Sequence, residues 1–392
     1  KLKQNIVQMF QLSGNGLNGH NAAAGKKLIE QYNKSRLNGQ RHSLCLAPFT
    51  NMYFGHRGRV SACCYNRHHL LGTYPEQSLL SIWRGEKAAE LRSKLAKNDL
   101  SSGCGSCESL IKSKNFDAVI ARNYDLLPIN LNYPSKLEFE LSNTCNLECT
   151  MCFGEFSSYI RKNREKKPAI ESPYDDNFLK QLYDFIPHLH STRFFGGEPF
   201  LIDLYYKIWD KIIDLNPSCQ IVVQTNGTVL NNRVKGFLSN GNFNINVSID
   251  SIDKTTYESI RVNAKFEKVM ENIRYFYKYC KENGRNLGIS ICPMPSNWKE
   301  IPEMIKFCNR LDAFMYFNTV WYPEEHSLAH LPSSRLSEIL SYFDAFEFPC
   351  NTVIEQNNRH HYKDFVKQLE SWHKLAVKSE IQEEKRKREE QK

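Results

Sequence analysis

The chain has 392 residues, of which 41% are hydrophobic, and this length predicts one large core together with a smaller second one. Its net charge of +9 arises from 52 basic residues interleaved with 43 acidic ones, so the charge alone does not indicate a nucleic-acid partner. No stretch approaches the roughly 20 apolar residues of a membrane-spanning helix, and the first residues lack the apolar core of a signal peptide. We therefore expect a cytoplasmic protein without membrane contact, although the chain begins at Lys1 rather than with a methionine.

Residues 1–40 form an extension rich in Asn, Gly and Lys, and residues 41–125 form a cysteine-rich segment. This segment holds Cys45, Cys63, Cys64, Cys104 and Cys107. Within it, "SLLSIWRGEKAAELRSKL" at 78–95 has the spacing of one amphipathic helix. The chain contains 13 cysteines and no secretory signal, which favours metal ligation over disulfide bonds.

From residue 136 onward, strand-like and helix-like segments alternate. The strands are expected at 136–142, 192–195, 220–225, 243–250, 287–292 and 314–320. The helices between them are expected at 178–190, 201–215, 230–238, 254–283 and 301–311, with a break near Arg261. Six strands joined by five crossover helices predict an α/β fold, a partial (β/α)6 barrel of parallel strands over 136–322 that resembles a TIM barrel. Residues 323–392 are then a helical region whose charged tail, 378–392, is solvated.

The unusual segments of this half each follow a strand. "CNLECTMC" at 145–152 follows the first, "GGEP" at 196–199 the second, "TNGT" at 225–228 the third, and "SID" at 248–250 closes the fourth. In parallel barrels the chemistry lies at the carboxyl ends of the strands. We therefore expect these four segments to form one site. Three thiols are one fewer than a closed tetrahedral metal site needs, so either a fourth ligand comes from elsewhere or the site is open.

The ordered set of C-x3-C-x2-C followed by "GGEP" resembles the radical S-adenosylmethionine (SAM) superfamily over roughly 136–322. The resemblance implies that Cys145, Cys149 and Cys152 hold three irons of a 4Fe-4S cluster whose fourth iron binds SAM. It implies that Gly196, Gly197 and Glu198 meet the methionine amino group. Further cofactor-binding residues implied by the resemblance are Thr225, Asn226, Ser248, Asp250 and Arg261, for the ribose and the methionine carboxylate. Met151 occupies the place of an aromatic residue that packs on the adenine in many relatives.

The segment before residue 110 resembles the SPASM/twitch auxiliary-cluster modules of radical enzymes. Cys45 is followed after twelve residues by Gly58, Gly58 after four by Cys63, and "SLLSIWRG" comes next. The resemblance implies a second 4Fe-4S cluster on Cys45, Cys63, Cys104 and Cys107, with Gly58 in a tight turn and Val60 in an inward apolar contact. Cys64 stays an alternative to Cys63, because neighbouring side chains of an extended segment point to opposite sides. The module precedes the barrel here, whereas in familiar relatives it follows.

The resemblance implies an enzyme that reductively cleaves SAM to a 5'-deoxyadenosyl radical, which then takes a hydrogen atom from the substrate. A peptide or protein is the first candidate substrate, to be oxidised, crosslinked or epimerised; a sugar or other small molecule is the second. An electron donor such as flavodoxin or ferredoxin is an implied partner. Cys292 and Cys350 are candidate hydrogen donors to a substrate radical, and a buried core thiol is the plainer interpretation of each.

Several alternatives stay open. Either set of thiols could bind zinc instead of an iron–sulfur cluster. The segment "GGEP" could form an ordinary turn, Asp250 could cap the helix that follows it, and Arg261 could form an ion pair at the surface. A metal-stabilised scaffold without enzymatic activity, binding nucleic acid, is the alternative from another functional class.

Overall fold

The computed structural model describes residues 25–36 and 41–391. The chain forms two compact units. Unit 1 comprises Lys1–Asn146, Phe153–Thr225 and Val229–Ile245, and unit 2 comprises Leu147–Cys152, Asn226–Thr228 and Asn246–Lys392. None of the described helices is long and apolar enough to cross a membrane.

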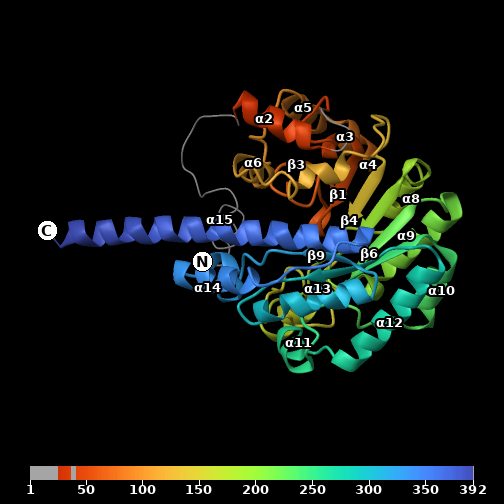
Figure 1. The fold of residues 1–392 in the computed structure, drawn as a ribbon. Helices are drawn as coiled ribbons and strands as arrows, with labels where there is room; N and C mark the ends of the chain where they lie inside the picture. The colour runs from red at the N-terminus through yellow and green to blue at the C-terminus, as the bar shows by residue number, and fades with distance from the viewer. Residues whose placement is uncertain (1–24, 37–40, 392) are drawn as a thin grey trace. The chain divides into compact units, whose positions relative to one another are not determined.

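Unit 1 begins with a helical and hairpin-rich part. Its elements are α2 (Lys26–Ser35), α3 (Ala47–Thr50), β1 (Asn51–Phe54), a 3-10 turn (His56–Gly58), β2 (Arg59–Ser61), β3 (Leu70–Thr73), α4 (Leu79–Arg84), α5 (Glu86–Ala96), α6 (Gly105–Lys112) and a 3-10 turn (Ile120–Tyr124). Then follow β4 (Lys136–Phe139), α7 (Ser158–Asn163), α8 (Asp176–Leu182), β5 (Ser191–Phe194), α9 (Asp203–Leu215), β6 (Gln220–Thr225), α10 (Asn232–Asn240) and the start of β7 (Phe243–Ser248). Figure 1 shows this order by colour.

The strands of unit 1 lie in the order β3-β2-β1-β4-β5-β6-β7. The pairs β1-β2 and β2-β3 are antiparallel, whereas β1-β4, β4-β5 and β5-β6 are parallel. The cysteine-rich part therefore shares one sheet with the rest of unit 1, because its strand β1 pairs with β4. This continuity is a feature that the sequence pattern did not reveal.

One face of this sheet is closed by aromatic side chains. Phe139 of β4 and Phe194 of β5 stack with ring centroids 4.9 Å apart, and both are almost fully buried. Phe178 of α8 meets Phe139 edge-on, and Trp209 of α9 meets Phe194. Burial of such side chains contributes about 1.5–3 kcal/mol each. This face is called the outer face below, and the opposite one the inner face.

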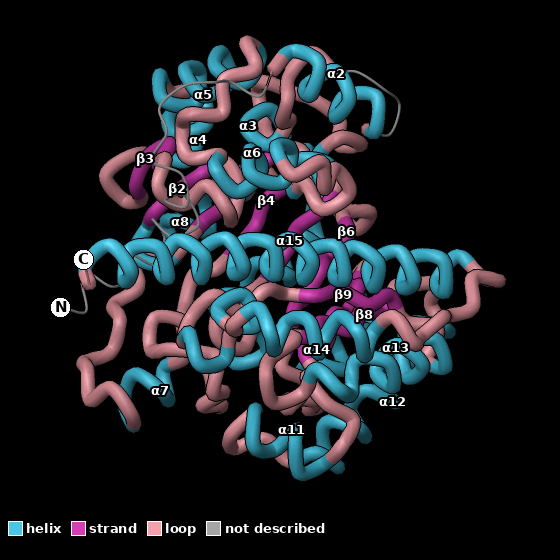
Figure 2. The backbone as a smooth tube through the Cα atoms, turned by 60° about the vertical axis from the view of Figure 1, so that its left-hand side comes forward, coloured by secondary structure: helices cyan, strands magenta, loops and turns pink. Residues whose placement is uncertain are grey.

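Unit 2 contains the end of β7, α11 (Lys254–Ile260), α12 (Phe266–Glu282), β8 (Leu287–Ile291), α13 (Ile301–Arg310), β9 (Phe314–Phe317), α14 (Ser333–Phe343) and α15 (Val353–Glu390). Its strands lie in the order β7-β8-β9, with β8 and β9 parallel. Figure 2 shows α14 and β9 beside α15. A capping box of Thr352 and Glu355 starts α15, and its last turns are exposed, as expected for the charged tail.

All six predicted strands form, and the predicted break near Arg261 separates α11 from α12. Two helix predictions are wrong in extent. The segment 78–95 is two helices, because Gly85 ends α4 and begins α5. The segment 178–190 is helical only to Leu182 in α8 and then forms a 3-10 turn, Ile186–His188, which has a proline in its first turn. Most of the extension, residues 1–24 and 37–40, lies outside the described residues.

Gly58 provides the first test. Its φ of +76° is in the left-handed region, and a Cβ there would lie 1.8 Å from the carbonyl oxygen of Tyr74. We expect Gly58→Ala to lower the free energy of unfolding by at least about 1–2 kcal/mol in urea titrations. Gly236→Ala is the control, since Gly236 lies in α10 with open space around it. It should be neutral or stabilising by up to about 1 kcal/mol. Equal effects of the two variants would contradict the turn assignment.

Candidate functional site

Four loops of unit 1 lie at one edge of the sheet. They follow the parallel strands β1, β4, β5 and β6, and they contain Gly55–Gly58, Ser142–Cys145, Gly196–Pro199 and Thr225 respectively. The carboxyl ends of parallel strands meet at the same edge, which explains the convergence. Three of the four loops were predicted to form a site; the loop after β1 was not.

The glycine loop holds the start of the cysteine loop through the backbone. Gly197 N donates to Ser142 O (3.1 Å), and Glu198 N donates to Thr144 O (2.7 Å). A Cβ on Gly196 would lie 2.5 Å from Ser142 O, and one on Gly197 would lie 2.1 Å from Thr144 O. Glycine is therefore required at both positions, because the two backbones approach too closely for a side chain.

The Glu198 side chain is fully buried and faces the end of β6. Its Oε1 accepts from Thr225 Oγ1 at 2.7 Å and from Phe200 N at 3.1 Å. The structure thus brings Glu198 and Thr225 together, as expected for one site. The adjoining Asn226 belongs to unit 2, where its Oδ1 accepts from the backbone N and the hydroxyl of Thr228. Ser248 is half-buried at the end of β7.

The cysteine loop is anchored by its own neighbours. In unit 1, Ser158 Oγ lies 3.0 Å from Cys145 N and 3.1 Å from Cys145 O. In unit 2, Cys152 N donates to Cys149 O (3.1 Å), which forms a tight turn between these two cysteines. Thr150 N donates to Ile260 O at the end of α11. Each part of the loop is therefore held by hydrogen bonds to its backbone groups.

Met151 packs in unit 2 against a small apolar cluster. The cluster consists of Ile260, Met294 and Val320, and Cys292 packs against it as well. Burial raises the pKa of the Cys292 thiol, and the charges of Asp250, Cys149 and Cys152 raise it further. Cys292 is thus a neutral thiol close to the last two cysteines of the loop.

Asp250 and Arg261 form a buried ion pair in unit 2. Arg261 Nε lies 2.8 Å from Asp250 Oδ2, and Cys292 N donates to Asp250 Oδ1 at 2.7 Å. Burial raises the pKa of Asp250, opposed by the Arg261 charge. Although burial lowers the pKa of Arg261, the Asp250 and Cys149 charges outweigh it and raise this pKa overall. Asp253, not Asp250, caps α11 by accepting from Thr256 N.

Cys350 lies apart from Cys292. It precedes α15, which runs along β9. Early in α15, Asn358 accepts from Met315 N at the start of β9. Later in α15, Gln368 contacts Thr319 beyond the carboxyl end of that strand. Cys350 is exposed, and its Sγ lies 3.1 Å from Arg359 Nη1. The structure therefore places it toward the amino end of β9, while Cys292 follows the carboxyl end of β8.

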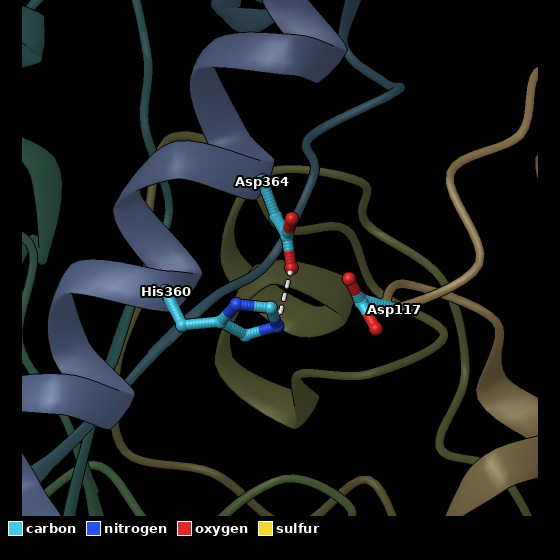
Figure 3. Close-up of side chains that lie close together, drawn as sticks. All are labelled: Asp117, His360 and Asp364. Atoms are coloured by element: carbon cyan, nitrogen blue, oxygen red, sulfur yellow. Dashed lines mark ion pairs between the residues drawn. The ribbon is translucent and has the colours of Figure 1, made fainter. Parts of the chain in front are cut away.

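Further along α15, His360 Nε2 and Asp364 Oδ2 lie 3.2 Å apart on successive turns (Figure 3). Lys367 pairs with Asp364 as well, at 3.3 Å. Such i,i+4 and i,i+3 pairs stabilise helices locally.

The cysteine-rich part of unit 1 gathers four thiols around one cavity. Cys45, Cys63, Cys104 and Cys107 all line it, together with apolar residues such as Leu44, Ile111 and Ile120. Cys64 is not among the lining residues. Burial raises the pKa of the Cys45, Cys63 and Cys107 thiols and raises that of Cys104 to about 12. Four such thiols with one apolar wall indicate a site that a metal centre would complete.

The predicted turn at Gly58 and the inward contact of Val60 are both present, since Gly58 has φ +76° and Val60 is fully buried. His56, between them and β1, was not predicted. It is 7% exposed, and its Nε2 has no hydrogen-bond partner among the described residues. Burial lowers the pKa of His56 to about 4, so the ring is neutral near pH 7. Because β1 is parallel to β4, His56 lies at the same edge of the sheet as the loops after β4, β5 and β6. The sequence alone does not reveal this pairing.

The Asp250–Arg261 pair gives the second test. Asp250→Asn should lower the free energy of unfolding by about 3–5 kcal/mol, because it leaves the buried guanidinium without a counter-charge. Glu267→Gln breaks the exposed Lys254–Glu267 pair of the same unit and should cost no more than about 1 kcal/mol. Urea titrations of both variants would measure this, and a loss below 1 kcal/mol for Asp250→Asn would contradict the buried pairing.

Comparison with known proteins shows that two parts of the chain match known protein families. Residues 139–308 match the radical SAM superfamily, and residues 45–108 match the iron–sulfur cluster-binding domain called SPASM. A GTP 3',8-cyclase of Aliarcobacter butzleri is 27% identical over 180 residues, which are 44% of this chain and 51% of that protein. A cysteine-type anaerobic sulfatase-maturating enzyme of Clostridium novyi is 30% identical over 188 residues, 45% of this chain and 48% of that protein. The chain thus spans about half the length of these relatives.

Solved structures that are similar to this chain include native anSMEcpe with bound AdoMet. That chain is 23% identical, with a TM-score of 0.40, over 53% of this chain and 59% of its own. SuiB of Streptococcus suis bound to S-adenosylmethionine is 14% identical, with a TM-score of 0.37, over 70% of this chain and 52% of its own. The two family matches fall on the two thiol sets described above, and the chain thus contains a radical SAM domain at residues 139–308 with a SPASM-type iron–sulfur domain ahead of it at residues 45–108.

Proposed function

We propose that the protein is a radical SAM enzyme that reductively cleaves S-adenosylmethionine to a 5'-deoxyadenosyl radical and abstracts a hydrogen atom from a peptide or protein. The observation that carries the proposal is the C-x3-C-x2-C segment directly after β4, clamped at its start by the glycine loop after β5. A radical SAM domain implies a 4Fe-4S cluster and SAM, and a SPASM domain implies additional iron–sulfur cluster chemistry.

The chain's own residues would divide the work as follows. Cys145, Cys149 and Cys152 would hold the SAM-binding cluster, which supplies the electron for cleavage when bound. Gly196, Gly197 and Glu198 would line the methionine amino group. Arg261, aligned by Asp250, would hold the methionine carboxylate, since a guanidinium matches both of its oxygens. Thr225, Asn226 and Ser248 would face the ribose, and Met151 would pack on the adenine.

The auxiliary cluster would be held by Cys45, Cys63, Cys104 and Cys107. The observation that supports this set is the shared cavity, which all four cysteines line. A closed set of four thiolates leaves no iron for a ligand, which suits electron transfer or a structural role.

A peptide or protein substrate is favoured by the relative whose name denotes sulfatase maturation, because a sulfatase is a protein. The cyclase relatives support the second candidate, a small molecule. The proposed electron donor is a flavodoxin or ferredoxin. If the reaction is an epimerisation, Cys292 is the better candidate hydrogen donor, because it lies near Cys149 and Cys152 whereas Cys350 lies toward the amino end of β9.

The activity is tested by anaerobic reconstitution with iron and sulfide, followed by dithionite and SAM. The expected result is brown protein with about eight irons per chain and release of 5'-deoxyadenosine. Bound zinc without iron, or iron-loaded protein that releases no 5'-deoxyadenosine, would contradict the proposal.

The auxiliary ligands give a sharper prediction. Cys63→Ser should lower the iron content from about eight to about four per chain, whereas the neighbouring Cys64→Ser should retain about eight. The difference follows from the cavity, which Cys63 lines and Cys64 does not. Iron analysis of both variants after identical reconstitution would measure it. An equal loss in both, or a loss only in Cys64→Ser, would overturn the assignment of Cys63.

A further inference from the structure

A run of positive charge follows the cysteine loop in unit 1. The segment "RKNREKK" at 161–167 contains five basic residues and one acidic residue, Glu165. It comprises the end of α7 and the turn after that helix. Charged runs on a protein surface are often disordered, whereas this one is held in place by contacts on both of its sides.

The start of α7 is tied to the cysteine loop. Ser158, the first residue of α7, donates its backbone N–H to Asn143 O at 2.7 Å. Its Oγ lies 3.0 Å from Cys145 N and 3.1 Å from Cys145 O. Because an α-helix rises 1.5 Å per residue, Lys162 lies about 6 Å along the axis from Ser158. The basic run therefore begins about one helical turn from the backbone of a proposed cluster ligand.

The carboxylates of this region hold it together. Glu165 Oε1 accepts from Gly154 N at 2.8 Å, and Glu165 Oε2 lies 2.6 Å from Lys167 Nζ. Glu155 Oε2 lies 3.9 Å from Arg161 Nη1. The two acidic side chains are thus engaged by other groups of the same region, and they leave the outward-facing lysines unmatched.

Lys162 and Lys166 are these outward-facing lysines. Both are exposed, and neither forms an ion pair or a hydrogen bond with residues 25–36 or 41–391. Lys166 has a φ of +51°, in the left-handed region that glycine adopts at lower cost. A positive charge is therefore present at a position where the backbone favours a residue without a side chain.

An exposed aromatic ring lies beside this charge. Tyr159 precedes Lys162 by three positions, so the two side chains lie on one side of α7, and the Tyr159 side chain is 44% exposed. After the helix, Lys167 N donates to Arg161 O at 2.9 Å, which turns the chain back beside the helix end and brings Lys166 with it. We call Tyr159, Lys162 and Lys166 the basic surface.

We propose that the basic surface docks an acidic one-electron carrier protein, such as a flavodoxin. A positive surface attracts and orients a negatively charged partner, and electron-transfer encounters bury less than about 1,200 Å², so a small surface is sufficient. In the encounter the carrier loses one electron and the SAM-binding centre gains it, and no atom is transferred. The inference rests on the proposed function, which needs one electron for each SAM cleaved, and it deepens that function by placing the donor at α7.

The test compares two electron sources for the full, iron-reconstituted chain with SAM. These are dithionite and an acidic flavodoxin kept reduced by NADPH and its reductase. Lys162→Glu combined with Lys166→Glu should slow flavodoxin-driven release of 5'-deoxyadenosine about tenfold or more at low salt, since charge steering contributes factors of about 10–10³ to association. Dithionite needs no docking surface, so its rate should stay within about twofold of the wild type. The tenfold difference should shrink at about 1 M salt, where charges are screened beyond about 3 Å.

Lys374→Glu combined with Lys378→Glu is the matched control. It makes the same charge change at two exposed lysines with the same spacing, on α15 in unit 2, and should leave the flavodoxin-driven rate within about twofold of the wild type. An equal loss in the control, an unchanged flavodoxin-driven rate in the Lys162 and Lys166 variant, or an equal loss with dithionite would overturn the inference.

Binding of the flavodoxin is measured separately, by titration without SAM followed through flavin fluorescence. The wild type should bind about tenfold or more tightly than the variant of Lys162 and Lys166. Equal binding by the two, or binding by neither, would overturn the basic surface. A wild type that releases no 5'-deoxyadenosine with dithionite would contradict the proposed function alone, because the titration does not depend on SAM cleavage.

Discussion

The parallel pairing of β1 with β4 is the constraint on which unit 1 depends. It joins the cysteine-rich part to the sheet that carries the radical SAM motif, residue by residue from Asn51 opposite Lys136 to Phe54 opposite Phe139. Because the pairing is parallel, the turn after β1 lies at the same edge as the loops after β4 and β5. The same register places Tyr53, Glu138 and Arg193 across one face. A shift of the β1–β4 register by one residue would turn the side chains that now face inward to the opposite face.

The two thiol sets differ in how their surroundings are built. The four auxiliary cysteines share an apolar cavity and come from three separate stretches of chain, so tertiary structure must bring them together. The cysteines of the short loop are brought together by sequence, and their loop is held through backbone contacts with the glycine loop, Ser158 and the end of α11. The two thiol sets are therefore positioned by different physical means, side-chain packing in one and hydrogen bonds to the backbone in the other.

Much of this organisation is predictable from sequence because it depends on local patterns. Alternation of apolar residues identifies all six strands from β4 to β9, and the spacing of Cys145, Cys149 and Cys152 needs no tertiary information. The alternation of side chains predicts that only one of Cys63 and Cys64 faces the auxiliary site, and the cavity, which Cys63 lines and Cys64 does not, favours Cys63. Where the prediction of a helix fails, the cause is a residue that interrupts the helix locally. At Gly85 one expected helix ends and a second begins.

Other features could not be predicted because they depend on pairing between distant segments. Nothing in "NMYF" specifies that β1 pairs with β4. The sequence therefore could not predict that His56 lies at the sheet edge that carries the loops after β4, β5 and β6. The place of Arg193 beside Glu138 likewise emerges only from the register between β4 and β5. A signal did exist in the charged residues of "KLEFELS", since carboxylates inside a parallel strand are unusual.

The most direct measurement is electron paramagnetic resonance of the dithionite-reduced, reconstituted protein with and without SAM. We predict two cluster signals, of which SAM alters one, and that one should be missing from a variant with Cys145, Cys149 and Cys152 all changed to serine. The other signal should persist in the variant and be insensitive to SAM. A signal that survives the triple change and still responds to SAM would contradict the assignment of one open and one closed cluster.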